Sequence, residues 1–201
     1  AAFSNADSTS LPAVNTGIKF CFATVKPGGD TIWEGRPGIT RTASSLTHHK
    51  QADAIQLASL GFPKTDYFNI WVVSSINQTN SILGYSTLPP LLGTLDGVVI
   101  RYDVFGDNTP GNNFFLFPGN DQGKVLVHEV GHYLFLYHTF DGGCSGMTSI
   151  DCDSLGDKVC DTPPDSIPHF GCPTDTPNTC SETPIDLPDQ FENFMDYTDD
   201  P

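Results

Sequence analysis

Residues 128–138 read HEVGHYLFLYH and carry the strongest chemical signal in the chain. His128 and His132 are four residues apart, so on a helix of 3.6 residues per turn both imidazoles lie on one face and can reach one cation. Glu129 stands beside them as a candidate general base. Three protein ligands with water in the fourth position are typical of catalytic rather than structural zinc. The H-E-x-x-H spacing therefore predicts a zinc hydrolase site, against the alternative of an amphipathic helix with incidental histidines.

A third ligand is expected at His138, but a continuous helix would not bring it to the metal. Six residues after His132, the helical period places a side chain roughly 240° round the axis. The chain must therefore leave the helix, and the longer motif H-E-x-x-H-x-x-G-x-x-H has glycine at that point. Here the residue is Phe135, for which a positive φ costs about 1–2 kcal/mol. A different scheme would take the third ligand from Glu182 or Glu192; His138 is preferred.

Composition limits the classes of function. At 201 residues the chain can bury the core of one domain. The balance of 24 acidic against 9 basic residues, net −15, argues against nucleic-acid binding. The sequence contains no apolar run long enough for a membrane span. Five of the six cysteines fall between Cys144 and Cys180 without a C-x₂-C pair, which favours disulfides and a secreted protein.

The pattern of elements indicates an α+β fold, with helices packed on one sheet. Alternating or apolar runs predict four strands, at about residues 17–25, 69–75, 82–88 and 97–105. The apolar run 114–117 is assigned to the core. After Thr139, proline, aspartate, glycine and cysteine dominate, so little regular structure is expected there.

Two helices are expected. One runs from about Ser45 to Leu60, with His48 and His49 facing solvent. Its inward residues are predicted to be Leu46, Ala52, Ile55 and Ala58. The other carries HEVGH and is predicted to start near Asn120 or Asp121, both good cap residues.

The chain resembles the pappalysin family of metzincin metalloproteases over roughly residues 17–201. The resemblance rests on NIWV, LGYS, GVVI, HEVGHYLFLYHTF, GGC, GDKVCDTP, GCP and NFMDYTDD. It implies one two-lobed catalytic domain over 1–201. The upper subdomain, about 1–138, would be a twisted mixed sheet with a backing helix and the zinc helix. The lower one, about 139–201, would be irregular and tied by disulfides, and the chain would stop short of the family's closing helix.

The resemblance also implies roles for residues after the zinc motif. Met195 matches the methionine of the turn beneath the metal, a packing residue. Tyr197 matches the tyrosine that approaches the substrate carbonyl, and a phenol there can stabilise an oxyanion. The GDKVCDTP stretch resembles the family's calcium loop, with Asp157, Asp161 and Thr162 as ligands. Asp153 is a further candidate ligand, and the alternative is a turn of solvated aspartates.

Substrate contacts are expected at two places. Gly84, Tyr85 and Ser86 would form an edge strand that binds an extended peptide main chain to main chain. Asp199 and Asp200 could favour Arg or Lys after the scissile bond, a preference of several family members, although an exposed acidic tail would look the same.

The resemblance implies a disulfide between Cys144 and Cys180, and Cys152 and Cys160 look like an additional pair. The family partner of Cys172 would lie beyond Pro201, which leaves Cys172 and Cys21 unassigned. The predicted protein is thus a secreted zinc- and calcium-binding endopeptidase acting on peptides and proteins, with no nucleic-acid partner and an open oligomeric state. The alternative is a catalytically inactive zinc-binding or adhesion module on the same fold.

Overall fold

The computed structural model describes residues 15–30, 37–88, 95–109, 111, 114–146, 151–182 and 186–199. The chain forms two compact units and passes from one to the other between Tyr102 and Asp103. The first unit contains the β-structure, and the second contains the helix with the HEVGH motif. The predicted boundary between two subdomains near residue 138 stays a prediction.

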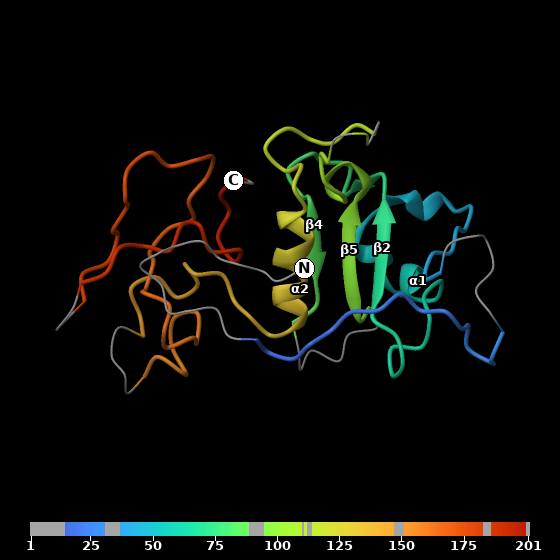
Figure 1. Cartoon of the computed structure of the whole chain (residues 1–201), viewed down its shortest axis with the longest axis horizontal. Helices are drawn as coiled ribbons and strands as arrows, with labels where there is room; N and C mark the ends of the chain where they lie inside the picture. The colour runs from blue at the N-terminus through green and yellow to red at the C-terminus, as the bar shows by residue number, and fades with distance from the viewer. Residues whose placement is uncertain are drawn as a thin grey trace. The chain divides into compact units, whose positions relative to one another are not determined.

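A three-stranded mixed sheet organises the first unit (Figure 1). Its order is β2 (Asn69–Val73), β5 (Gly97–Arg101) and β4 (Gly84–Ser86), with β5 parallel to β2 and antiparallel to β4. Every residue of β5 is buried, as its run of β-branched side chains predicts for a central strand. The strands expected at 69–75, 82–88 and 97–105 are confirmed in shorter form, and the fold is α+β as predicted.

The prediction of a single helix over 45–60 is wrong. The segment is divided into short elements, and β1 pairs in parallel with β3 (Ser75–Ile76). The divided elements are η1 (Ser45–Thr47), β1 (His48–His49), η2 (Gln51–Asp53) and α1 (Ala54–Ala58). His49 was expected to face solvent, but the strand pairing buries it completely, whereas His48 is exposed as predicted.

The inward face of this segment also differs from the prediction. Leu57 is its buried hydrophobic residue, whereas Ile55 is 64% exposed and Ala52 is exposed. Leu46 and Ala58 do pack against the core as expected. The reason is that a five-residue helix preceded by a strand and a short 3₁₀ helix does not keep the 3.6-residue register of a continuous helix. The core of the first unit consists of Leu57, Val73, Ile76, Leu95 and Val99.

The strand predicted at 17–25 is not formed over 17–24. Phe20 and Phe22 are 57% and 76% exposed, so the alternation does not bury one face there. Alternating apolar residues give a strand propensity, but a strand also needs a neighbouring backbone to pair with.

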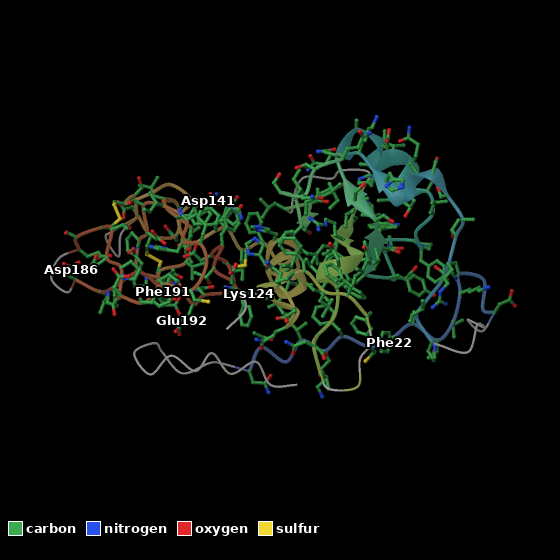
Figure 2. The ribbon with its side chains drawn as sticks, turned by 90° about the horizontal axis from the view of Figure 1, so that it is seen from above. Phe22, Lys124, Asp141, Asp186, Phe191 and Glu192 are labelled. Atoms are coloured by element: carbon green, nitrogen blue, oxygen red, sulfur yellow. A yellow bond between two sulfur atoms is a disulfide. The ribbon has the colours of Figure 1, made fainter. Side chains whose placement is uncertain are left out.

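The second unit begins within η3 (Tyr102–Val104) and contains α2 (Lys124–Tyr133). Asn120 and Asp121 were expected to cap α2, but its N-cap is Gly123 at φ 85°, without a side-chain cap bond. The described residues from 134 onward contain no helix and no strand longer than an isolated bridge. Two disulfides hold this irregular part, seen as yellow bonds in Figure 2.

The apolar run 114–117 was assigned to the core, and this is wrong for its three phenylalanines. Phe114, Phe115 and Phe117 are 55%, 66% and 36% exposed. Among the described residues, no helix has the length and apolar character needed to cross a membrane.

Candidate metal centre

Three histidines converge in the second unit. His128 and His132 lie on α2, and His138 follows it; ligand atoms of all three lie within 4.8 Å of one another. The Nε2 atoms of His132 and His138 are 3.0 Å apart. Imidazole nitrogens this close can share one metal ion. The expected third ligand is therefore brought to the other two, and neither Glu182 nor Glu192 belongs to this group.

A tight turn after α2 brings His138 back. Phe135 has φ 78°, so the left-handed conformation expected of a glycine is adopted here by an aromatic residue. The turn is closed by hydrogen bonds from the Phe135 amide to the His132 carbonyl, 2.9 Å, and from the Leu136 amide to the Gly131 carbonyl, 2.9 Å. The surrounding backbone thus imposes the unfavourable φ on Phe135.

Backbone carbonyls orient the two helical histidines. The Nδ1 atom of His128 lies 2.7 Å from the Phe194 carbonyl oxygen, and that of His132 lies 2.8 Å from the Leu136 carbonyl oxygen. An Nδ1–H that donates to a carbonyl fixes the tautomer and leaves Nε2 as the free ligand atom. This donor set fits a metal ion of the kind that imidazole prefers, zinc among them.

The third histidine is held by a carboxylate. Asp141 places Oδ2 3.4 Å from Nδ1 of His138 and accepts a hydrogen bond from the His138 backbone amide at 3.1 Å. Figure 2 labels Asp141 on the segment that follows the turn. The sequence analysis did not assign Asp141, although its i+3 spacing from a predicted ligand was a usable signal.

His128 and His138 are kept neutral. Burial, followed by the neighbouring His132, lowers the pKa of His128 to about 3. The same two causes lower the pKa of His138. A neutral imidazole is the form that binds a metal ion, so these two ligands are ready to bind without first losing protons at neutral pH.

Glu129 is buried beside the histidines, with 5% of its surface exposed. Burial raises its pKa to about 8, and its Oε2 atom makes no hydrogen bond within the described structure. A carboxylate deprived of water in this way is a stronger base than an exposed one.

Tyr197 is placed against the third histidine. Its hydroxyl oxygen lies 3.1 Å from Nε2 of His138, and the residue is 41% exposed. Burial, followed by the charge of Glu129, raises its pKa, so the phenol keeps its proton and can donate it in a hydrogen bond.

Met195 packs directly beneath α2. It is 5% exposed, and a Cβ atom at Gly131 would collide with its sulfur. The glycine of HEVGH is therefore needed for the methionine to approach the helix. Sequence reasoning placed Met195 under the metal but did not assign this role to Gly131.

Asp157 interacts with two of the other three candidate calcium ligands, Asp161 and Thr162. Asp157 is half-buried, its Oδ1 accepts the Val159 amide at 3.0 Å, and both Thr162 and Asp161 act on its carboxyl. Burial raises the pKa of Asp157 to about 6. Asp153 is exposed and is not among the groups that act on it.

The candidate substrate residues lie in different parts of the chain. Gly84, Tyr85 and Ser86 form β4, at the edge of the three-stranded sheet. The carboxylate of Asp199 lies against Gly119, where a Cβ atom would be 2.9 Å from Oδ2. Asp200 lies outside the described residues.

The disulfides are Cys144–Cys180 and Cys152–Cys160. These are the pairs named in the sequence analysis. Cys21 and Cys172 are free and exposed.

Comparison with known proteins gives consistent matches. The peptidase M43 family, described as pregnancy-associated plasma protein-A, matches residues 108–200. An extracellular metalloprotease of Pyricularia oryzae is 37% identical over 136 residues, which is 66% of this chain and 41% of that protein. One from Colletotrichum graminicola is 40% identical over 141 residues, 68% of this chain and 44% of that protein.

Among solved structures, mature mirolysin of Tannerella forsythia, in complex with a cleaved peptide, superposes with a TM-score of 0.64 at 31% identity. The match covers 89% of this chain and 62% of mirolysin. The region matched in the fungal metalloproteases is less than half of their length.

Proposed function

Because the chain belongs to the pappalysin family of metzincin metalloproteases, we propose that it is a secreted zinc endopeptidase. The observation that carries the proposal is the convergence of His128, His132 and His138 within 4.8 Å. Secretion is supported by two disulfides, which persist in oxidising compartments. It is also supported by relatives that are named extracellular metalloproteases.

The three imidazoles would hold one zinc ion through their Nε2 atoms. When bound, zinc supplies a Lewis acid that polarises the peptide carbonyl and makes water more acidic. The protein fixes the direction of each ring in advance, so little ordering remains to be done when the ion binds.

Glu129 acts as the general base. It takes a proton from the attacking water and later delivers it to the leaving amine. Its burial and its unsatisfied Oε2 atom suit this role, because no protein donor competes for the proton-accepting oxygen. A cation nearby favours the ionised form that the base requires.

Tyr197 stabilises the oxyanion that forms as water adds to the carbonyl carbon. Its hydroxyl is protonated at neutral pH, because its pKa is raised, and it lies 3.1 Å from Nε2 of His138. A substrate oxygen that enters beside the histidines would replace this nitrogen as the hydrogen-bond acceptor.

Substrate recognition uses the edge strand β4 and Asp199. The Tyr85 hydroxyl is 2.6 Å from Nε2 of the buried His49, so β4 offers its backbone rather than this side chain to a peptide. Asp199 favours Arg or Lys after the scissile bond by charge. Asp199→Asn should weaken kcat/KM for Arg and Lys peptides more than for Leu peptides.

Calcium belongs to the same proposal as a structural ion. Asp157, Asp161 and Thr162 supply hard oxygen atoms from one loop, as calcium requires. Asp153, which is exposed, is the candidate for a further oxygen.

A cleavage assay on Arg- and Lys-containing peptides tests the proposal. The chain with one zinc should cleave them, a zinc chelator should stop cleavage, and added zinc should restore it. Glu129→Gln keeps the size of the side chain but cannot accept the proton, so kcat should fall by about 10²–10⁴-fold at unchanged zinc content. Glu192→Gln, an exposed glutamate in the same unit, is the matched control.

The alternative function is a zinc-binding or adhesion module without catalysis. It would be favoured if the protein bound zinc but cleaved no peptide. Cleavage that survives Glu129→Gln unchanged would instead contradict the mechanism.

A further inference from the structure

A second cluster of ionisable side chains lies buried in the second unit, apart from the three histidines. Asp165, Asp189 and Asp196 are 0%, 3% and 2% exposed, and all three surround His169, whose side chain is 9% exposed. Nδ1 of His169 is hydrogen-bonded to Oδ2 of Asp196 at 2.9 Å and lies 3.2 Å from Oδ2 of Asp165. Its Nε2 is 3.5 Å from Oδ2 of Asp189.

Two of these carboxylates have one oxygen fixed by the protein and the other turned to His169. Oδ1 of Asp165 accepts hydrogen bonds from the Ile167 amide at 3.1 Å and the Thr179 hydroxyl at 3.0 Å. Oδ1 of Asp196 accepts the His169 amide at 3.0 Å and the Tyr197 amide at 2.7 Å. The Oδ2 atoms are thereby held in place.

The third carboxylate is also anchored. Both oxygens of Asp189 accept the Thr179 amide, at 3.1 and 3.0 Å. The backbone and hydroxyl groups that hold the cluster therefore come from three separate stretches of chain. Such anchoring holds the carboxylate oxygens in position before any ligand binds to them.

The negative charges of the cluster are not fully compensated by its own side chains. Three buried carboxylates face one imidazole, which can contribute at most one positive charge. Oδ2 of Asp165 is fully buried and has no hydrogen-bond partner in the described structure, and Nε2 of His169 likewise has none. Buried charges are normally paired or bound to a metal ion.

We propose that Asp165, His169 and Asp196 form a second metal site, for a divalent transition-metal ion such as zinc or manganese. Their ligand atoms lie within 4.8 Å of one another. Donor atoms at right angles around an ion at about 2.1 Å are about 3.0 Å apart, which agrees with the 2.9 and 3.2 Å seen here. The nitrogen ligand disfavours calcium, which takes oxygen ligands.

Asp189 has a different part in this site. With Nδ1 of His169 on the metal, Nε2 would carry the proton and could donate it to Oδ2 of Asp189, which lies 3.5 Å away without a hydrogen bond between the two atoms in the described structure. A carboxylate that accepts the second N–H of a ligating histidine fixes its tautomer and makes it a better ligand. Asp189 is thus a positioning residue rather than a ligand.

The site would also fix the segment that carries Met195 and Tyr197. Asp196 lies between them, and its carboxylate accepts the Tyr197 amide. An ion bound by the other oxygen of Asp196 would hold this segment to the loop of Asp165 and His169. Metal binding at the second site would then order the Tyr197 hydroxyl beside His138 at the first site.

Metal stoichiometry of the whole chain tests the inference without any assay of activity. The protein is stripped with a chelator, dialysed against zinc or manganese in excess calcium so that oxygen-only sites are filled, and analysed for bound metal. With zinc, two ions per chain are expected. His132→Ala removes a ligand of the first site and should leave one ion; His132→Ala with Asp165→Asn should leave none. Asp189→Asn should weaken the second ion about 10–100-fold.

One zinc per chain in the natural sequence, or none in His132→Ala, would overturn the inference. The cluster would then be held together by the contacts among its own side chains. The His132→Ala measurement leaves the second cluster intact, so it decides the question even if Asp165→Asn fails to fold. Failure of peptide cleavage with two ions bound would count against the proposed peptidase and not against this site.

Discussion

The Nδ1 atom of His132 lies 2.8 Å from the carbonyl oxygen of Leu136, four residues later. The turn that brings His138 back to the cluster therefore also fixes the ring of the preceding ligand. Leu136 can take this position because the chain reverses at Phe135, with φ 78°. The three ligands thus depend on one strained residue.

Replacing Phe135 by glycine should relieve this strain. An L-residue in the left-handed conformation costs about 1–2 kcal/mol, whereas glycine has no such cost. Phe135→Ala is the matched control, because it also removes the ring but keeps Cβ. Urea unfolding of the zinc-loaded proteins should find Phe135→Gly more stable than Phe135→Ala by about 1 kcal/mol. Equal stabilities would mean that the turn is not strained.

Gly131→Ala should destabilise the protein, although alanine favours a helix by about 1 kcal/mol over glycine. The added methyl group would collide with the Met195 sulfur, and overpacking of this kind costs about 1–3 kcal/mol. Thermal unfolding and zinc titration are the measurements. Both stability and zinc affinity should fall.

A double-mutant cycle makes this prediction specific. Met195→Ala alone should cost about 2–5 kcal/mol by leaving a cavity. In Gly131→Ala with Met195→Ala the collision is absent, so the combined loss should be smaller than the sum of the two. Additive losses would show that the glycine and the methionine are not in contact.

Tyr85→Phe should destabilise the first unit. It removes the hydroxyl that lies 2.6 Å from Nε2 of His49, and the Nδ1 atom of this fully buried ring already has no hydrogen-bond partner in the described structure. A buried polar atom left unsatisfied costs about 1–3 kcal/mol. Urea unfolding should show this loss. The exposed neighbour His48 is the control: a loss from His48→Ala as large as that from Tyr85→Phe would argue against burial as the cause.

The first metal site could be predicted from the sequence because its ligands have a fixed helical spacing. His128 and His132 need only a helix to share a face, and the helix α2 contains both. The apolar run of β5 likewise predicts a buried central strand. In both cases a local period determines which way the side chains point.

The second cluster could not be predicted in this way. Asp165 and His169 have the spacing of a helix, but no helix forms there. Asp189 and Asp196 reach them through loops that are tied by side-chain bonds and by the Cys144–Cys180 disulfide. His49 was misplaced for a related reason, since its burial depends on pairing with Ile76, far along the chain. Contacts between distant segments leave no period in the sequence.

The pH dependence of stability should reveal the state of Asp157. Burial raises its pKa from 3.8 to about 6 in the folded protein. The stabilisation from its protonated form is therefore fully present below pH 3.8 and is lost as the pH rises through about 6. In a calcium chelator, Asp157→Asn should gain melting temperature relative to the natural sequence between pH 4 and pH 7, because asparagine does not ionise.

Calcium should reverse the order of the melting temperatures of the natural sequence and Asp157→Asn. At pH 7 the ionised Asp157 would be a ligand, so saturating calcium should raise the melting temperature of the natural sequence above that of Asp157→Asn. The measurement is calorimetric melting at several pH values with a calcium-selective chelator or with calcium, at constant zinc. Asp153→Asn is the control, because this exposed residue is not among the groups that act on Asp157. A difference between the natural sequence and Asp157→Asn that depends on neither pH nor calcium would contradict both the raised pKa and the calcium loop.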